Sequence, residues 1–289
     1  MKEPLFTGVC TALVTPFLKD EINYPMVQQL LRRQMDAGIS AVVMAGTTGE
    51  APTLFDSEKI ELFRRSKAYC GNQCKIIAGT GSNSTKHAVE LSIAAEKVGA
   101  DALLVVSPYY NKATPDGLVA HYLSIAEAVN IPVILYNVPS RTGLDIPVSV
   151  YQILSQKSNI VGVKEASTDI TKIAKIRNAC GRDFTIWSGN DEQTVPAMAM
   201  GCKGIISVLS NVLPVETAAM ANAALLEDFK TASALQCKLL PIIELLFCQV
   251  NPIPVKEAMT CIGFDCGTCR LPLTALAEEY KRKLYDCFS

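Results

Sequence analysis

The sequence predicts a (β/α)8 barrel, a TIM barrel of the α/β class, followed by a C-terminal helical extension. Short apolar runs recur at regular intervals, amphipathic stretches lie between them, and a glycine turn precedes several of the runs. Apolar strands that alternate with helices are typical of a parallel sheet covered by helices. The eight runs expected to form strands are Val9–Val14, Ile39–Ala45, Lys75–Ala78, Ala102–Val106, Val133–Tyr136, Ile160–Val163, Phe184–Trp187 and Gly204–Val208.

The stretches between these runs place apolar residues at helical spacing, so we expect helices there. Five of them are clear: Met26–Ala37, Ser57–Cys70, Lys86–Val98, Gly117–Val129 and Thr171–Cys180.

A weak internal repeat supports the barrel. Gly38, Gly99 and Gly201 each stand where a helix must stop and turn into a strand, a position that needs a positive φ. Eight such units close a barrel more naturally than an open sheet. The alternative, an open doubly wound sheet, usually carries a glycine-rich dinucleotide turn after its first strand. Here the first run is followed by Thr15-Pro16-Phe17, which cannot form that turn.

We divide the chain into residues 1–212, which hold the barrel and the expected site, and residues 213–289, which we expect to pack on the barrel as helices. No flexible linker separates the two parts. The expected C-terminal helices are Val215–Leu226, Phe229–Leu246, Pro254–Ile262 and Thr274–Tyr285.

Composition excludes several classes of partner. The formal net charge of −1 argues against nucleic acid or a membrane surface. The N-terminus, Met1-Lys2-Glu3-Pro4, lacks the apolar run of a signal peptide, and no apolar stretch is long enough for a membrane span, so we expect a cytoplasmic protein.

The 11 cysteines are an odd number scattered through apolar surroundings, which favours reduced, buried thiols. Cys266 and Cys269 match CxxC, but a structural zinc wants a second ligand pair, and the only histidines are His87 and His121. We therefore expect no metal, and a loop that happens to carry two cysteines.

In a (β/α)8 barrel the active site forms at the C-terminal ends of the strands. Lys164 closes the sixth run there, whereas Lys75 and Lys203 stand at the N-terminal ends of theirs. A partly desolvated lysine disfavours its ammonium form, and the free amine can attack a carbonyl. From position alone, a catalytic Lys164 and an internal salt bridge, with Glu165 as partner, are equally good readings.

Other polar residues follow the strands. Tyr136 ends the strand beside Lys164 and can shuttle protons, or it is a tyrosine at the edge of the core. In the turn Gly46–Gly49, backbone N–H groups with the Thr47 and Thr48 hydroxyls suit a carboxylate, or form a tight turn with no ligand. Arg141 can bind a second carboxylate in a bidentate way, or form a surface ion pair.

These residues lie in motifs that resemble the dihydrodipicolinate synthase family of pyruvate-dependent class I aldolases. The resemblance covers nearly the whole chain, and GTTGE, YNVPSRTG and NPIPVK are specific to it. The motifs are GVCTALVTPF, AGTTGE, IIAGTGSN, SPYYNK, YNVPSRTG, VGVKEAS, WSGND, GIISVLSN, NPIPVKEAM and RLPL.

The resemblance implies a role for each residue. Lys164 forms a Schiff base with pyruvate. Tyr136 shuttles protons and is coupled through Thr47 to Tyr110, which comes from the neighbouring subunit of a tight dimer. The remaining implied roles concern substrate: Thr48 holds the pyruvate carboxylate, Arg141 receives the carboxylate of L-aspartate-4-semialdehyde, and Gly189 and Ile206 line the pocket through their backbone.

The implied reaction gives 4-hydroxy-tetrahydrodipicolinate, in diaminopimelate and lysine biosynthesis, with no cofactor or metal and with a homotetramer of two tight dimers as the assembly. Two alternatives stay open. One is another pyruvate-dependent aldolase, of the N-acetylneuraminate lyase or keto-deoxy-sugar aldolase type, against which Arg141 and the Thr47–Thr48 pair weigh. The other is a non-catalytic barrel acting as a sensor, which has no need for Lys164, Tyr136 and Thr47 together.

The sequence departs from the family's pattern at one place. Members inhibited by lysine carry an acidic residue on the helix after the third strand, where this chain has His87. Asn83 and Tyr109 remain, but Ala51, Pro52, Asp56 and Lys59 look unlike that lysine pocket. An imidazole does not replace a carboxylate as the partner of an ammonium group. The hypothesis is that L-lysine inhibits weakly or not at all.

Overall fold

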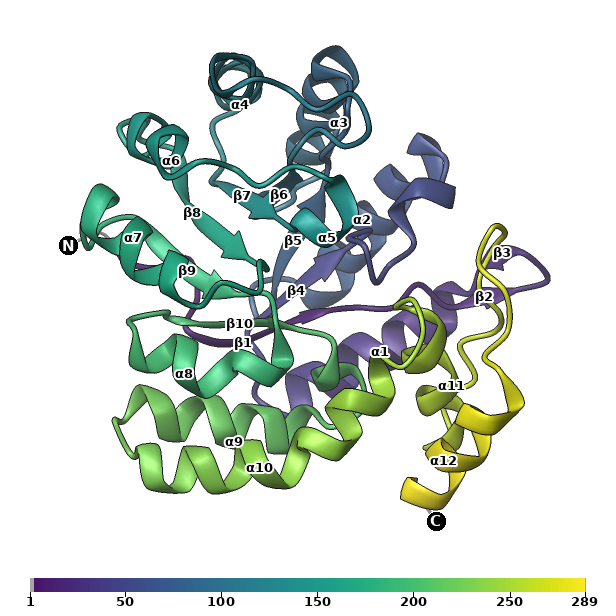
Figure 1. The fold of residues 1–289 in the computed structure, drawn as a ribbon. Helices are drawn as coiled ribbons and strands as arrows, with labels where there is room; N and C mark the ends of the chain where they lie inside the picture. The colour runs from purple at the N-terminus through teal and green to yellow at the C-terminus, as the bar shows by residue number, and fades with distance from the viewer. Residues whose placement is uncertain (1–2, 289) are drawn as a thin grey trace.

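The computed structural model of the chain describes residues 3–288 and contains a closed barrel of eight parallel strands surrounded by helices (Figure 1). Met1 and Lys2, on which part of the expectation about the N-terminus rests, lie outside the described residues. The strands follow one another around the barrel in the order β1-β10-β9-β8-β7-β6-β5-β4, and β1 pairs with β4 to close it. The predicted fold class is confirmed, and the open sheet is excluded.

Each barrel strand coincides with one of the predicted apolar runs, with differences of one or two residues at most of the ends. The runs are short and apolar because both faces of a barrel strand are covered, one by the barrel interior and one by helices. The strands are β1 (Gly8–Ala12), β4 (Ala41–Met44), β5 (Lys75–Gly79), β6 (Ala102–Val106), β7 (Val133–Asn137), β8 (Ile160–Glu165), β9 (Thr185–Ser188) and β10 (Gly204–Ser207).

Helices cover the outside of the barrel, and side chains at their first turns explain where they begin. Asn23, Ser84 and Thr114 each accept a hydrogen bond from a backbone N–H of the first turn, which satisfies a donor that has no partner within the helix. The covering helices are α1 (Tyr24–Asp36), α2 (Asp56–Cys70), α3 (Thr85–Lys97), α4 (Pro115–Ala128), α6 (Val148–Leu154), α7 (Thr171–Cys180) and α8 (Thr194–Ala199).

The repeated glycine turns are confirmed as left-handed positions. Gly38, Gly99 and Gly201 have φ of 76°, 91° and 101°, and each follows a helix and leads into a strand. L-residues rarely adopt such a φ, so glycine at these points ends the helix without strain.

Several short elements lack a prediction because their sequences are too short to show a period. They include the antiparallel hairpin of β2 (Phe17–Leu18) and β3 (Glu21–Ile22), which extends from the end of the first barrel unit. The others are α5 (Pro139–Thr142) and the 3₁₀ helices η1 (Ala51–Thr53), η2 (Asp191–Gln193) and η3 (Leu209–Asn211).

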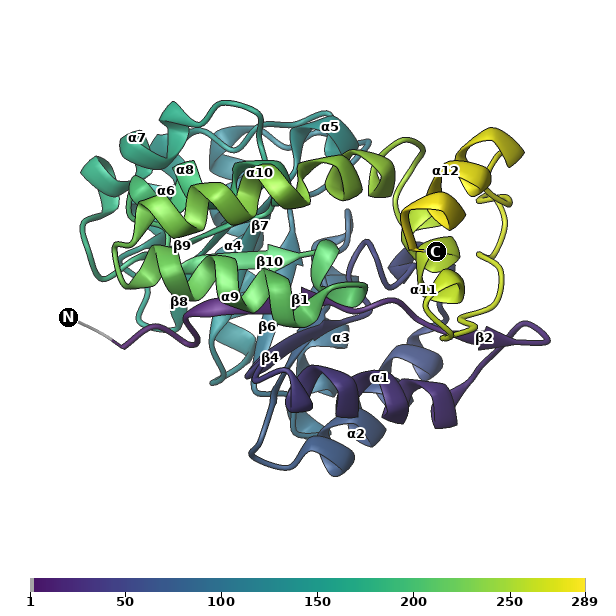
Figure 2. The same ribbon diagram turned by 90° about the horizontal axis from the view of Figure 1, so that it is seen from below.

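The C-terminal part folds as helices against the barrel: α9 (Pro214–Leu225), α10 (Phe229–Leu246), α11 (Ile253–Cys261) and α12 (Glu278–Phe288). Helices α9 and α10 run side by side along one flank, and α11 and α12 pack together at another side of the barrel (Figure 2). The chain between α11 and α12 lies next to the β2–β3 hairpin, where the Phe17 N–H donates to the Cys266 carbonyl at 2.9 Å. The domain boundary at residue 213 stays a prediction.

The predicted start of the last helix at Thr274 is wrong. Residues 274–277 follow a helical apolar pattern, yet the helix begins at Glu278. The reason is a tertiary hydrogen bond: the Gln249 side chain accepts from the Ala277 N–H at 2.8 Å. The carbonyl of Ala277 then accepts the first helical bonds from Tyr280 and Lys281, so Ala277 caps the helix.

A buried ion pair ties the C-terminal part to the barrel mouth. Lys256 Nζ lies 2.9 Å from Glu50 Oε1, and both side chains are almost wholly buried. Glu50 Oε2 also accepts from the backbone N–H of Arg270 at 2.8 Å, and Lys256 donates to the Thr268 carbonyl at 3.1 Å. Three sequence motifs, GTTGE, NPIPVK and RLPL, therefore meet at one structural joint.

The barrel interior is filled rather than open. Phe6 stacks on Trp187 with ring centroids 4.8 Å apart, and the Trp187 indole N–H donates to the Phe6 carbonyl. Apolar side chains from the barrel strands complete this inner cluster, and a larger cluster lies between the strands and the helices. Any site must therefore lie at a mouth of the barrel, above the packed interior.

Within residues 3–288, no helix combines the length and the apolar character needed to cross a membrane. All 11 cysteines are free, including Cys266 and Cys269. In the same range, no three His, Cys, Asp or Glu side chains are arranged to hold a metal ion.

Candidate active site

A cavity of about 340 Å³ opens at the C-terminal end of the barrel, on the face where the strands β4, β7, β8 and β9 end. It is lined by Thr47, Thr48, Tyr136, Arg141, Lys164 and Gly189, together with residues that were not predicted. Six of the eight residues proposed from the sequence thus share one cavity, although they come from distant parts of the chain. The cavity lies where barrel enzymes carry their active sites.

Lys164 is the central cation of this cavity. Its side chain is only 5% exposed, and among residues 3–288 its Nζ has no hydrogen-bond or ion-pair partner. The expected alternative, a salt bridge with Glu165, is wrong because consecutive strand residues point to opposite faces. Glu165 points away from the barrel interior and accepts from Asn137 and from the Ser167 N–H. Lys164 is therefore available to a ligand.

Strand register brings Tyr136 to Lys164. The two residues are register partners in neighbouring parallel strands, so their side chains lie on the same face. Lys164 Nζ lies 4.5 Å from the centroid of the Tyr136 ring. The lysine amine therefore packs against the face of the tyrosine ring, which places these two candidate catalytic side chains next to each other in the cavity.

The turn after β4 forms another wall of the cavity. Thr48 is buried, and its hydroxyl accepts a hydrogen bond from Asn251 Nδ2 at 3.0 Å. Thr47 is partly exposed and also lines a neighbouring cavity. Both hydroxyls lie in the turn Gly46–Gly49 that follows β4. That this turn binds an anion stays a prediction.

Arg141 lies on α5 and faces the cavity. Its Nη2 donates to the Asn251 carbonyl at 3.0 Å, and within the described residues it forms no ion pair. The alternative of a surface ion pair is therefore not supported. Because one nitrogen is already anchored, the remaining guanidinium donors are oriented and free for a carboxylate.

Gly189 follows β9 directly and is required by close packing. A Cβ atom at this position would lie 2.9 Å from Lys164 Cε and 2.6 Å from Ala166 Cβ. Any other residue would therefore push against the lysine. Ile206 is fully buried in the inner cluster, and Val208, two residues further on, lines the cavity.

Tyr110 does not join this cavity within the single chain. Its side chain is 91% exposed, and its backbone has a positive φ of 71°. Its neighbour Tyr109 lines the second cavity instead. A role for Tyr110 at Lys164 would need a second subunit, so that assignment stays a prediction.

Asp191 is a functional candidate that the sequence did not reveal. It is fully buried after β9 and accepts from Ser207 Oγ at 2.5 Å and from the Val208 N–H at 2.9 Å. Burial raises its pKa, which these hydrogen bonds and the charge of Lys164 partly offset. The carboxylate holds the ends of β9 and β10 together below the cavity, so it positions Gly189 and Val208.

Other residues that line the cavity were not predicted from the sequence. Asn251 belongs to the NPIPVK motif, so that motif was the available signal. Glu192, Glu244 and Phe247 come from η2 and from the end of α10, and no motif marks their proximity. Only the packing of the C-terminal helices on the barrel brings them to the site.

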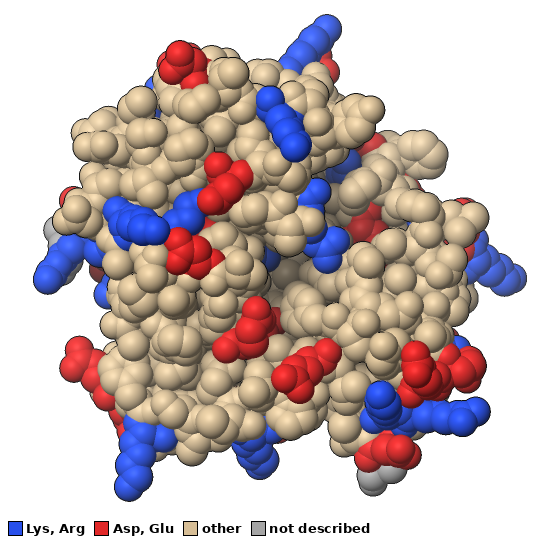
Figure 3. Space-filling view, viewed as in Figure 1, with Lys and Arg blue, Asp and Glu red and all other residues tan. Residues whose placement is uncertain are grey.

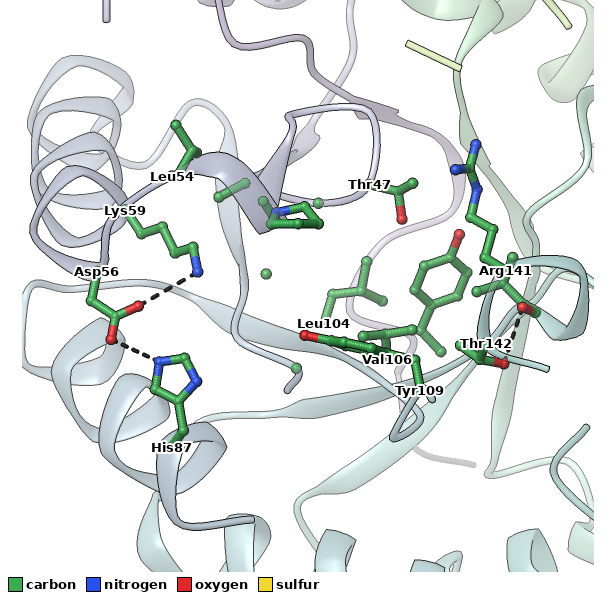
Figure 4. A pocket seen from close by; sticks show the side chains of 18 of the residues that line it. Thr47, Leu54, Asp56, Lys59, His87, Leu104, Val106, Tyr109, Arg141 and Thr142 are labelled. Atoms are coloured by element: carbon green, nitrogen blue, oxygen red, sulfur yellow. Dashed lines mark hydrogen bonds and ion pairs between the residues drawn. The ribbon is translucent and has the colours of Figure 1, made fainter. Parts of the chain in front are cut away.

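A second cavity of about 590 Å³ adjoins the first and shares Thr47, Tyr136 and Arg141 with it. Its far wall carries a polar cluster in which Asp56 lies between His87 and Lys59 (Figure 4). Asp56 is 2.7 Å from His87 Nε2 and 3.5 Å from Lys59 Nζ. Burial alone would raise the Asp56 pKa, but His87 and Lys59 outweigh it and lower that pKa. The cluster is satisfied internally.

Fold and site together define a class of protein: a (β/α)8 barrel with an unpaired, buried lysine beside a tyrosine at the catalytic mouth. The chain belongs to the dihydrodipicolinate synthetase family, whose profile matches residues 5–289.

Individual relatives agree with this family. The 4-hydroxy-tetrahydrodipicolinate synthase of Acetivibrio thermocellus is 44% identical over 279 residues, which is 96% of this chain and 95% of that protein. The crystal structure of dihydrodipicolinate synthase from Aquifex aeolicus is 41% identical, with a TM-score of 0.96 over 98% of this chain and 97% of the other. DHDPS from Cyanidioschyzon merolae with lysine bound is 39% identical, with a TM-score of 0.94 over 97% of this chain and 96% of the other.

Proposed function

We propose that this chain is a lyase that condenses pyruvate with L-aspartate-4-semialdehyde to 4-hydroxy-tetrahydrodipicolinate, in lysine and diaminopimelate biosynthesis. The observation that carries the proposal is the buried, unpaired Lys164 in contact with Tyr136. The family and its closely similar relatives bear the same activity in their names. A sensor barrel would gain nothing from a buried lysine without a partner, because burial of an unpaired cation destabilises the fold.

The reaction begins with the Lys164 amine. Its Nζ attacks the C2 carbonyl carbon of pyruvate, and the carbinolamine loses water to give an iminium ion. A proton then leaves the pyruvate methyl group, and the resulting enamine carbon attacks the aldehyde carbon of the second substrate. The amine of that substrate attacks C2, closes the ring and expels the Lys164 amine. One water leaves per turnover, and no oxidant or metal takes part.

Tyr136 is the proton carrier of this proposal. It serves both the loss of water and the removal of the methyl proton, since both steps occur at atoms bonded to the Lys164 imine. Thr47 is proposed to link it to Tyr110 of a neighbouring subunit. The exposure of Tyr110 supports this, because a tyrosine that completes a partner's site is uncovered in a single chain. The assembly we propose is a tight dimer, paired into a homotetramer.

The substrate carboxylates have separate sites in this proposal. Thr48 and the adjoining backbone bind the pyruvate carboxylate, while Arg141 binds that of the semialdehyde. Support comes from the bond between Arg141 and the Asn251 carbonyl, which orients the guanidinium toward the cavity. Gly189 leaves room for the lysine. Ile206 lies in the inner cluster, and Val208, two residues further on, lines the cavity.

Borohydride reduction in the presence of pyruvate tests the proposal. It should fix pyruvate irreversibly on Lys164, which peptide mass spectrometry would locate. Adduct formation without product from L-aspartate-4-semialdehyde, but with cleavage of a sialic or keto-deoxy sugar acid, would assign another aldolase. Absence of any adduct on Lys164 would overturn the Schiff-base mechanism.

A further inference from the structure

Four charged side chains line the Lys164 cavity without an ion-pair partner among residues 3–288. Two are cations, Lys164 and Arg141, and two are acids, Glu192 and Glu244. The other buried lysines each pair with a carboxylate, namely Lys59, Lys172 and Lys256. Unpaired charges of both signs in one cavity indicate a ligand that itself carries both signs.

The two acids come from separate elements that are fastened together. Glu192 lies in η2, directly after β9, and Glu244 lies in the last turn of α10. Gln236 of α10 donates to the Asp191 carbonyl at 3.1 Å and accepts from the Val195 N–H at 3.2 Å. This clamp fixes α10 against η2, so packing sets the backbone positions from which both acidic side chains extend.

Charged side chains of both signs surround the hollow on this face of the molecule. Figure 3 shows a hollow near the centre of this face, with acidic side chains along its lower edge and basic side chains at its upper right edge. Glu192 and Glu244 are exposed at the mouth, whereas Lys164 is buried below it. A ligand bound at Lys164 therefore shares its cavity with two exposed carboxylates.

Buried polar atoms without partners show that the cavity is built to hold a ligand. Lys164 is more than nine-tenths buried and has no ion-pair partner among residues 3–288. Asn251 Oδ1 is also buried and, within the described residues, accepts no hydrogen bond, although Nδ2 of the same amide binds Thr48. Such groups are costly unless a ligand satisfies them.

The inference rests on the proposed function and concerns its second substrate. L-aspartate-4-semialdehyde carries an aldehyde, a carboxylate and an ammonium group. The aldehyde must meet the enamine at Lys164, and the carboxylate goes to Arg141. We propose that Glu192 and Glu244 bind the ammonium group, so that they select an amino-substituted aldehyde over one without the amine.

The expected effect is moderate because both carboxylates face solvent. An exposed ion pair changes affinity by up to about fivefold. Removal of both carboxylate charges should therefore weaken the binding of the amino-aldehyde by roughly tenfold. Pyruvate binds deeper, at Lys164, and its apparent KM should not change. An aldehyde that lacks the amine should bind the variants as well as it binds the wild type, or better. The reason is that the variants no longer place glutamate carboxylates near the carboxylate of that aldehyde.

The test uses E192Q, E244Q and the double variant, with E279Q as a matched control on an exposed face of α12. The KM of L-aspartate-4-semialdehyde is measured at saturating pyruvate, beside the inhibition constant of succinate semialdehyde, which differs only in lacking the amine. We expect a higher KM for the amino-aldehyde in the double variant and no weakening of succinate semialdehyde binding. E279Q should match the wild type.

Two results would overturn the inference: an unchanged KM for the amino-aldehyde in the double variant, or equal weakening of both aldehydes. Failure of the proposed function looks different. In that case the wild type itself forms no pyruvate adduct or does not consume the amino-aldehyde, and the variants are not needed to see it.

Discussion

Lys164 and Lys256 are both buried at the same end of the barrel, 5% and 3% exposed, but their surroundings differ. Lys256 has a carboxylate from Glu50 and a carbonyl from Thr268 as partners. Lys164 has a tyrosine ring and a cavity. The first lysine closes a joint between the barrel and the C-terminal helices, and the second is left open to a ligand.

Burial alone therefore does not tell whether a lysine is structural or catalytic. A buried ammonium that is paired contributes to one particular arrangement of the chain, and its removal leaves an uncompensated charge. A buried amine without a partner lowers the free energy of unfolding, and the rest of the fold must compensate for that loss. The same absence of a partner leaves the amine free to react with a ligand. Substitution of each lysine should distinguish its structural role from a catalytic one.

The largest effect is expected for K164A. Without the nucleophile the covalent route is closed, so kcat should fall about 10⁴-fold or more, equivalent to roughly 5 kcal/mol. The free energy of unfolding should not decrease, because no partner is stranded. Steady-state kinetics and urea denaturation measure the two quantities. A variant that retains the wild-type rate would refute the mechanism.

K256M should show the reverse pattern. It strands the buried Glu50 carboxylate, and the free energy of unfolding should fall by about 3–5 kcal/mol. The double variant E50Q/K256M removes the stranded charge and should recover part of that loss. Urea denaturation of the three proteins gives the comparison. Equal stability of K256M and the wild type would mean that the ion pair is not a structural joint.

His121 is a buried base that, in the part of the chain the structure describes, pairs with no acid. It lies on α4 with Nδ1 2.9 Å from Thr85 Oγ1, and within the described residues its Nε2 has no partner. Burial lowers the pKa of His121 to about 4, from an ordinary value of 6.5. The unfolded chain therefore binds the proton first, and stability falls as the pH drops from 6.5 towards 4.

That slope is about 1.4 kcal/mol per pH unit, or roughly 2 kcal/mol between pH 6.5 and 5. H121N keeps a polar atom near Thr85 but does not titrate, so the difference in unfolding free energy between wild type and variant should shrink by that amount at pH 5. Urea denaturation at both pH values measures it. A difference that does not vary with pH would show that His121 is not buried as a neutral group.

The smallest effect is expected at the second cavity. Asp56 already pairs with His87 and Lys59, so an added ammonium finds no free carboxylate there. Millimolar L-lysine should change the condensation rate by less than about twofold, below roughly 0.4 kcal/mol. The rate at fixed substrate with increasing L-lysine measures this. Strong inhibition below 1 mM, on the order of −4 kcal/mol of binding or tighter, would contradict it.

Much of the fold follows from local patterns in the sequence. The eight strands, the main helices and the glycine turns at Gly38, Gly99 and Gly201 could be predicted from short apolar runs, helical periods and glycine positions, which can all be read in short segments of the sequence. The start of α12 could not be predicted, because a side chain 28 residues away takes the Ala277 N–H.

The candidate site divides in the same way. Lys164 and Tyr136 could be found because they lie at the ends of strands, and Thr48 because it lies in the turn that follows one; the ends of parallel strands meet at one mouth. Glu244 and Phe247 could not, because they lie on a helix of the C-terminal part whose docking leaves no local signal. Asp191 could not be predicted because its partners in hydrogen bonding, Ser207 and Val208, are 16 and 17 positions away in the sequence.

The sequence by itself determined that this protein is an eight-stranded barrel with a lysine at its catalytic mouth, because strand alternation and chain order suffice for that. Tertiary structure alone decided that, within residues 3–288, Lys164 has no hydrogen-bond or ion-pair partner whereas Lys256 does. Pairing depends on which side chains meet across the barrel and the C-terminal helices, and a separation of 206 residues, as between Glu50 and Lys256, leaves no trace in local sequence.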